Sequence, residues 1–396
     1  MSASRSLLAS TLAFALGSSP ALSARAERCE ERLLPSDLGD AHAFRDGQRR
    51  ALRGVTVGPI ESALHPERGY GSPAFERTLV EAQKMGATWI SLTPFGRVLD
   101  LKPTGVALSF EQPFSENRQA IRRAITQAHA RGLCVLLVPH LWVESGGWRA
   151  EIEPGGDAEW ANWAAGYSRF VRAWAEVARD AQADMFSAGV ELRSWVTTTR
   201  AASFSAVLQE VRKIYGGPVT YGANWDDVDD TVILGELDLI GINAFYPLAE
   251  QNGASREQLA AGGREVARRV AKLADAWHKP VIFTEFGYTT RSDPAVRPWE
   301  WPDAMVNVQV DQHAQAEAYA ALLTPLLDEP ALSGAFVWRL YADPDDLSQE
   351  AEWGFSPRGK LAELVLRDAY AAHWAADGPR RQSPLTVFAA ERIGIY

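Results

Sequence analysis

The stretch that decides the fold is Val281-Ile-Phe-Thr-Glu-Phe-Gly-Tyr288, an apolar run that carries a glutamate near its end. A second stretch, Phe186-Ser-Ala-Gly-Val-Glu-Leu192, has the same layout. Near-continuous apolar runs of this length predict strands that are buried on both faces of a parallel sheet. Each glutamate stands where its strand ends and a polar loop begins. That edge carries the active site in parallel α/β folds, so Glu191 and Glu285 are the candidate catalytic residues.

Past residue 50, short β-type runs alternate with long amphipathic stretches. The strand-like runs number eight, at about 52–57, 88–93, 133–139, 184–190, 218–222, 238–244, 280–285 and 334–338. Helical patterns lie at about 74–85, 117–131, 158–181, 201–215, 255–277, 312–328 and 358–375. This alternation predicts an α/β protein, a (β/α)8 TIM barrel that forms a single domain over residues 50–375.

One interval departs from the repeat. Residues 226–236, between the fifth and sixth strands, are short and acidic and hold no long helical pattern. A doubly wound open sheet is the alternative to a barrel. Such sheets usually carry a glycine-rich phosphate loop after the first strand, and none follows residues 52–57.

Composition excludes one class of partner. The chain has 396 residues, of which 46% are hydrophobic and 23% charged, and a net charge of -10. Nucleic-acid binding needs a dense basic stripe, and the sequence has none. Fourteen tryptophans make the chain rich in a side chain whose flat face stacks on sugar rings, although most of them could equally pack in the core.

The N-terminus has the layout of a secretory signal peptide. Arg5 precedes an apolar run at 7–16, and small residues at 21–26 offer a cleavage site. We therefore expect residues 1–26 to be removed, residues 27–49 to form a leader segment, and the protein to be secreted or periplasmic. The apolar run is too short to span a bilayer, and no membrane span is predicted elsewhere.

A disulfide between Cys29 in the leader and Cys134 in a predicted buried strand is possible but not expected. Residues 376–396 form an unassigned C-terminal tail.

The loops after several predicted strands are dense in residues that bind sugars. Their shared position at strand ends favours ligand contact over packing alone. The candidate substrate-binding residues are His140, Trp142, Asn224, Trp225, Asn243, Tyr246, Trp299, Trp301 and Trp338. The substrate they predict is an oligo- or polysaccharide. The seven histidines are scattered, so the sequence indicates no metal site and no cofactor.

Two carboxyl groups can cleave a glycosidic bond if one is protonated and the other ionised. Retaining enzymes hold the two about 5–5.5 Å apart, and the second carboxylate attacks the sugar to form a covalent intermediate. Neighbouring groups must hold the two pKa values apart, and Tyr246, Trp338 and His140 are candidates for that effect.

These motifs resemble clan A glycoside hydrolases, and most closely glycoside hydrolase family 113, whose members are β-mannanases. The matching motifs are Gly189-Val-Glu191-Leu, Thr284-Glu285-Phe-Gly-Tyr288, Ile240-Gly-Ile-Asn-Ala-Phe-Tyr-Pro247 and the tryptophan-rich loop before Asp311-Gln-His-Ala-Gln315. The resemblance covers about residues 50–375. It implies that Glu191 is the general acid/base, Glu285 the nucleophile and Tyr246 the residue that orients the nucleophile.

One position departs from the clan pattern. Many members carry Asn directly before the acid/base, where it can bond the sugar 2-hydroxyl, and this chain has Val190. Either Asn224 or Asn243 takes over that contact, or the enzyme is slower or prefers a sugar with a different 2-hydroxyl orientation, such as mannose. Three hypotheses remain at this stage: a secreted retaining β-glycosidase, a catalytically silent carbohydrate-binding barrel, and a metal-dependent hydrolase.

Overall fold

The computed structural model describes residues 51–59, 67–110, 112–327 and 329–370. Its main sheet consists of β1 (Leu52–Gly58), β2 (Trp89–Leu92), β4 (Cys134–Leu137), β6 (Met185–Val190), β7 (Val219–Asn224), β8 (Ile240–Asn243), β9 (Val281–Phe286) and β10 (Leu332–Tyr341). These strands are parallel and close into a barrel in the order β1-β10-β9-β8-β7-β6-β4-β2. The predicted (β/α)8 barrel is confirmed, and the open sheet is excluded.

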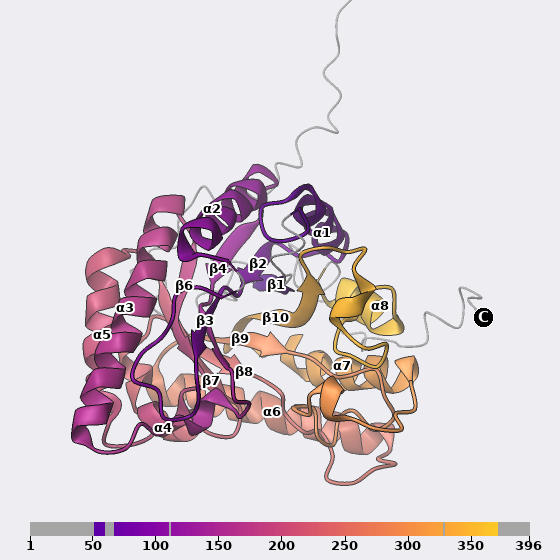
Figure 1. Ribbon diagram of the computed structural model, residues 1–396. Coiled ribbons are helices and arrows are strands. Elements are labelled where there is room, and N and C mark those ends of the chain that lie inside the picture. Colours follow the sequence, from indigo (N-terminus) through magenta and orange to yellow (C-terminus); the bar gives the residue numbers. More distant parts are fainter. Residues whose placement is uncertain (1–50, 60–66, 111, 328, 371–396) are drawn as a thin grey trace, which may run out of the picture.

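Helices surround the barrel on its outside (Figure 1). They are α1 (Pro73–Lys84), α2 (Phe114–Ala130), α3 (Asp157–Ala181), the short α4 (Arg193–Val196), α5 (Ala201–Ile214), α6 (Arg256–Trp277), α7 (Gln312–Leu327) and α8 (Leu361–Asp368). The start of α6 shows how sequence sets a boundary. The Ser255 side chain accepts a bond from the Gln258 amide, and the Gln258 side chain accepts one from the Ser255 amide, which is a capping box.

The interval between the fifth and sixth barrel strands holds no long helix, as the sequence predicted. It contains two 3-10 helices, η4 (Val228–Asp230) and η5 (Val232–Glu236), in place of a long helix. The last helix differs from its prediction at 358–375. It begins at Leu361, because Gly359 adopts a left-handed φ of 67° and ends a turn there. The predicted part beyond residue 370 lies outside the described residues, as do the predicted signal peptide, leader and tail.

A small second sheet was not predicted. It pairs β3 (Phe95–Val98) with β5 (His140–Val143), and both strands follow barrel strands almost directly. The sequence predicted His140 and Trp142 to lie in the loop after the strand at 133–139. The pairing of β3 with β5 matters for the site, because it fixes His140 and Trp142 on a strand.

The interior of the barrel is filled by its own side chains. Its cluster consists of Leu52, Trp89, Leu136, Val138, Met185, Val190, Leu239, Ile282 and Phe336. Val190, which stands where many clan members have Asn, therefore belongs to the barrel interior. The packing is close: a Cβ on Gly54 would lie 2.2 Å from the Phe336 ring. A much larger cluster joins the outer face of the strands to the helices.

Cys134 corrects another expectation. It is half-buried at the start of β4 and is disulfide-bonded, although no disulfide was expected from the sequence. The reason is its position, since the first residue of a strand lies at the rim of the barrel and not in its centre. The only other cysteine in the sequence, Cys29, lies outside the described residues.

Among the helices in the described ranges, none combines the length and the apolar character that crossing a membrane requires.

Candidate active site

Glu191 and Glu285 lie at the carboxyl ends of the fourth and seventh barrel strands. Glu191 directly follows β6, and its amide donates to the Gly222 carbonyl of β7 at 2.8 Å. Its φ of 51° is left-handed, which is uncommon for a residue with a side chain. Backbone strain of this kind concentrates at functional sites. Glu285 lies in β9 and pairs in register with Asn243 of β8. Both glutamates are more than nine-tenths buried.

Three side chains surround the carboxylate of Glu191. Trp148 donates its indole N–H to Oε2 at 2.9 Å, and Asn243 donates its amide to Oε1 at 3.0 Å. A guanidinium nitrogen of Arg149 lies 3.7 Å from Oε2. Both oxygens are therefore held in fixed directions, which a catalytic carboxyl group requires.

Asn243 is itself fixed by a neighbouring hydroxyl. Thr284 donates its hydroxyl to the Asn243 side-chain oxygen at 2.8 Å. An amide whose oxygen accepts this bond must turn its NH2 group the other way, toward Glu191. Asn243 is only 1% exposed, so water does not compete for the hydrogen bonds that orient its side chain. Of the two residues that the sequence offered as substitutes for the missing asparagine, Asn243 is the one that contacts Glu191, a candidate catalytic residue.

Glu285 has a different environment. Burial and the nearby Glu191 carboxylate raise the pKa of Glu285 from 4.5 to about 8, against smaller lowering effects of Arg149, Arg339 and Asn243. Nε2 of His140 lies 3.4 Å from its Oε1 without a well-directed hydrogen bond. Burial, then Arg149 and Arg339, holds the pKa of His140 well below its ordinary 6.5, so the imidazole is neutral.

His140 also stacks on Trp338, with ring centroids 6.2 Å apart and planes 17° from parallel. Three polar atoms of these side chains are buried and have no hydrogen-bond partner among the described residues: His140 Nε2, Glu285 Oε1 and the Trp338 indole nitrogen. Buried polar groups are nearly always paired. Their grouping indicates a position that a polar ligand or water completes.

The remaining predicted tryptophans form two exposed aromatic groups. Trp142 is 44% exposed and packs edge-on against Phe95 and Phe110. Trp299 is 47% exposed and stacks on Trp225, with centroids 5.4 Å apart. Exposed faces of this size on stacked rings suit the apolar side of a sugar.

Trp301, from the same loop as Trp299, is also 44% exposed. Its ring lies 5.9 Å from Phe355, and its indole N–H donates to Asp303. The tryptophan-rich loop therefore offers two aromatic faces, as its sequence predicted.

Two predicted residues point away from the glutamates. Asn224 donates its side-chain amide to Asp226 at 2.7 Å. The ring of Tyr246 packs against Trp225 and Phe283, beneath the guanidinium of Arg269 from α6. Within the described part of the chain, no hydrogen bond joins its hydroxyl to Glu285. The structure thus gives Tyr246 no contact through which to orient that glutamate.

Sequence reasoning missed three residues that surround the glutamate pair: Arg149, Thr284 and Arg339. Thr284 directly precedes Glu285, and its neighbour position was a usable signal. Arg149 lies in η3 (Arg149–Glu151) of a long loop, and nothing in the local sequence marks it.

No three His, Cys, Asp or Glu side chains of the described ranges are grouped so that they could hold a metal ion.

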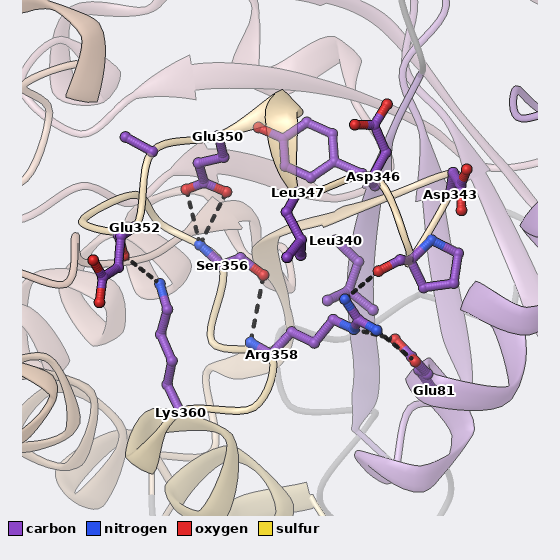
Figure 2. Close-up of a pocket in the computed structure, with 13 residues that line it drawn as sticks. Glu81, Leu340, Asp343, Asp346, Leu347, Glu350, Glu352, Ser356, Arg358 and Lys360 are labelled. Atoms are coloured by element: carbon purple, nitrogen blue, oxygen red, sulfur yellow. Dashed lines mark hydrogen bonds and ion pairs between the residues drawn. The ribbon is translucent and has the colours of Figure 1, made fainter. Parts of the chain in front are cut away.

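A cavity of about 320 Å³ lies beside this region, in the loop after β10 (Figure 2). Its wall combines acidic residues such as Glu81 and Glu350 with the basic residues Arg358 and Lys360 and with apolar side chains. Arg358 binds Glu81 and so joins the loop to α1, and the Ser356 amide donates to Glu350 within the loop. Neither Glu191 nor Glu285 lines this cavity. It is therefore distinct from the candidate active site.

The family follows from a direct match. The model of Glycoside Hydrolase Family 113 matches residues 63–360, which is three quarters of the chain and includes both glutamates. The chain belongs to Glycoside Hydrolase Family 113. The protein is accordingly a glycoside hydrolase, and the family suggested by its motifs is confirmed. No protein of curated function matches the chain.

Solved structures of Family 113 proteins resemble the whole barrel. The β-mannanase of Alicyclobacillus acidocaldarius, solved in complex with ManMIm, is 25% identical, with a TM-score of 0.69 over 82% of this chain and 98% of the other. A Family 113 β-1,4-mannanase, also solved as a complex, is 20% identical, with a TM-score of 0.69 over 81% and 99%. The second likeness shows the fold alone.

Proposed function

We propose that this glycoside hydrolase is a secreted β-mannanase that retains anomeric configuration through a double displacement. Glu191 acts as general acid/base and Glu285 as nucleophile. The observation that carries the proposal is the pair of buried glutamates at the ends of the fourth and seventh strands, beside three unpartnered polar atoms. The β-mannanases among the similar structures support the choice of sugar.

The glutamate pair can supply the one proton that the mechanism needs. With the pKa of Glu285 raised to about 8, the free pair holds one proton at neutral pH. The first step needs this proton on Glu191 and an ionised Glu285. A glycosidic oxygen next to Glu191 favours that arrangement, because it accepts the proton in the transition state.

The residues around the pair have separate positioning roles in this proposal. Asn243 and Trp148 aim the Glu191 carboxyl group. Trp338 provides a platform beneath the reacting sugar, and neutral His140 can bond a sugar hydroxyl. The exposed faces of Trp142 and Trp299 bind sugar units farther along the chain. Tyr246 receives no role at the nucleophile.

Export to the periplasm or the medium is part of the proposal. The signal-like segment at 1–26 supports it. The disulfide at Cys134 supports it independently, because disulfides persist in oxidising compartments and are rare in the cytosol. Expression with the native N-terminus in a bacterial host, followed by assay of cytoplasmic and periplasmic fractions, tests this. Protein that stays in the cytoplasm with its N-terminus intact would contradict export.

The decisive experiment is hydrolysis of a panel of β-mannan, β-glucan and xylan oligosaccharides by the full chain. Glu191→Gln and Glu285→Gln should each lower kcat at least about 10³-fold, whereas the control Glu176→Gln, on the exposed face of α3, should not. The first-formed product should keep the β-anomer. Hydrolysis of mannan with an inverted anomer, or full activity in either site variant, would contradict the mechanism.

The two roles can be assigned with an aryl β-mannoside, whose good leaving group needs no acid. Azide should rescue Glu191→Ala with a β-mannosyl azide as product, because the glycosyl-enzyme still forms. Azide should rescue Glu285→Ala with the α-azide, because azide then attacks directly in place of the nucleophile. The opposite pair of products would exchange the roles of the two glutamates.

A further inference from the structure

The strand that carries the proposed acid/base contains a β-bulge shortly before it. Ser187 of β6 pairs with Thr220 of β7, and the next pair joins Val190 to Gly222. The two residues of β6 between these pairs therefore stand opposite a single residue of β7, Tyr221. A bulge of this kind bends its strand and re-aims the side chains that follow, and bulges are common beside active sites.

Glu191 faces the site only because its backbone departs from that of a regular strand. Val190, the residue before it, belongs to the barrel interior. Successive side chains of a strand point to opposite faces, so a regular strand would direct Glu191 outward, toward the helices. Its left-handed φ of 51° breaks the alternation, and its carboxylate reaches Asn243 of β8 instead. Such a conformation persists only where surrounding contacts hold it.

Hydrogen bonds fix the peptides on both sides of Glu191. Its own amide donates to the Gly222 carbonyl at 2.8 Å. The amide of the next residue, Leu192, donates to the Tyr221 hydroxyl at 2.6 Å. The Leu192 carbonyl accepts a bond from the Trp195 amide at 2.9 Å, where α4 begins. Of these three contacts only the second comes from a side chain, so Tyr221 is the place where a substitution can remove support from the left-handed residue.

Tyr221 is itself fixed by its packing. It is 1% exposed, and its ring packs edge-on against Phe204 of α5, with centroids 5.5 Å apart. A Cβ on the bulge residue Gly189 would lie 3.1 Å from this ring and 2.7 Å from the Tyr167 hydroxyl, so the glycine leaves the space that both tyrosines need. Tyr167 donates its hydroxyl to the Ala188 carbonyl of the bulge at 2.9 Å. Burial raises the pKa of Tyr221 well above 10, so its hydroxyl stays protonated and neutral.

We propose that Tyr221 is a positioning residue for the general acid/base. By fixing the Leu192 amide, its hydroxyl holds Glu191 in the left-handed conformation that aims the carboxyl group at the glycosidic oxygen. Tyr221 belongs to the cluster between the strands and the helices, on the face of the sheet away from the barrel interior, so it touches no substrate. This inference rests on the proposed glycosidase function and adds to that site a residue that acts only through the backbone.

Tyr221→Phe in the full chain tests this role, because it keeps the buried ring and removes the hydroxyl. The substrates are aryl β-mannobiosides whose leaving groups range from dinitrophenol to phenol. The value of kcat/KM reports the first chemical step, in which the acid protonates a poor leaving group but is not needed for a good one. The variant should lower kcat/KM about tenfold for the phenyl substrate and less than about twofold for the dinitrophenyl substrate. A plot of log kcat/KM against the pKa of the leaving group should therefore be steeper for the variant.

A defect in folding alone gives a different pattern. Fewer active molecules lower kcat/KM by the same factor for every leaving group, so an unchanged slope in Tyr221→Phe would overturn the inference. The matched control is Tyr370→Phe, which removes a buried hydroxyl that bonds the Gly54 and Ala335 carbonyls of β1 and β10. Its slope should equal that of the wild type, and a slope as steep as that of Tyr221→Phe would overturn the assignment to Tyr221.

Amide hydrogen exchange, followed by mass spectrometry of overlapping peptides, supplies a readout that needs no substrate. The Leu192 amide should exchange slowly in the wild type and at least about tenfold faster in Tyr221→Phe, because it loses its acceptor. Rapid exchange in the wild type would overturn the inference even if the variant does not fold. Failure of the proposed function is distinct, since it would appear as no turnover of any aryl glycoside by the wild type. Turnover by the wild type with an unchanged slope in the variant would remove this inference alone.

Discussion

Replacing Glu285 with glutamine should stabilise the folded protein, and more strongly as the pH rises. The pKa of Glu285 is about 8 when folded, against an ordinary 4.5 that applies to the unfolded chain. Between these two pH values the folded state binds more protons than the unfolded state. The free energy of unfolding of the wild type therefore falls as the pH rises through this window. Below about pH 4.5 both states are protonated, and this contribution to stability is fully present.

The magnitude follows from the same two values. Each pH unit within the window costs the folded wild type about 1.4 kcal/mol for one proton. The whole window, from 4.5 to about 8, corresponds to about 5 kcal/mol as an upper figure. Water entry and relaxation around the ionised group reduce it. Glutamine is neutral throughout, so the variant should be more stable than the wild type by about 3–5 kcal/mol at pH 9 and nearly equal to it at pH 4.

The assay is chemical denaturation of both proteins at pH 4, 5, 6, 7, 8 and 9, with activity lost in the variant as a check of identity. Glu176→Gln serves as the control, because it removes the same charge from an exposed helix face. Its stability should follow the wild type at every pH. A difference between Glu285→Gln and the wild type that stays constant from pH 4 to pH 9 would refute the reasoning, since the carboxyl group would then carry no raised pKa.

Other predictions test the same centre and the scaffold. Asn243→Ala should lower kcat about 10–100-fold with a smaller effect on KM, because Glu191 loses a donor that aims it; an unchanged kcat would contradict this role. Trp148→Phe keeps an aromatic side chain but removes the indole N–H, which is the other donor to Glu191. Steady-state kinetics should show kcat lowered about tenfold. The profile of kcat/KM against pH should fall about tenfold per pH unit above about pH 8, where the pair loses its proton, and a flat profile to pH 10 would argue against this. Gly263→Ala should destabilise the fold by about 1–3 kcal/mol in denaturant unfolding, because the new Cβ would lie 1.9 Å from the Ala321 carbonyl oxygen of α7, and unchanged stability would contradict the close packing of α6 on α7.

The sequence by itself determined the barrel and the position of its glutamates. The spacing of apolar residues along a segment and its apolar content are local properties of the sequence. Eight strand-like runs that alternate with amphipathic stretches leave few arrangements that bury both faces of a parallel sheet. In such a barrel the carboxyl ends of all strands meet at one rim. A glutamate at the carboxyl end of a strand therefore lies on that rim, whatever the contacts between side chains are. The same logic located His140, Asn243 and Trp338, which the structure brings close to the pair.

Only the tertiary structure decided how these side chains face one another. Asn224 ends β7 as Asn243 ends β8, and Tyr246 follows β8 closely, yet Tyr246 lies under Arg269 of α6 and Asn224 bonds Asp226. Rotamer choice depends on neighbours from distant segments, and local sequence does not encode those neighbours. The same holds for Arg149, which reaches Glu191 from a loop. Charge balance and pKa values are sums over groups that only folding brings together, so they follow from the structure and not from the order of residues.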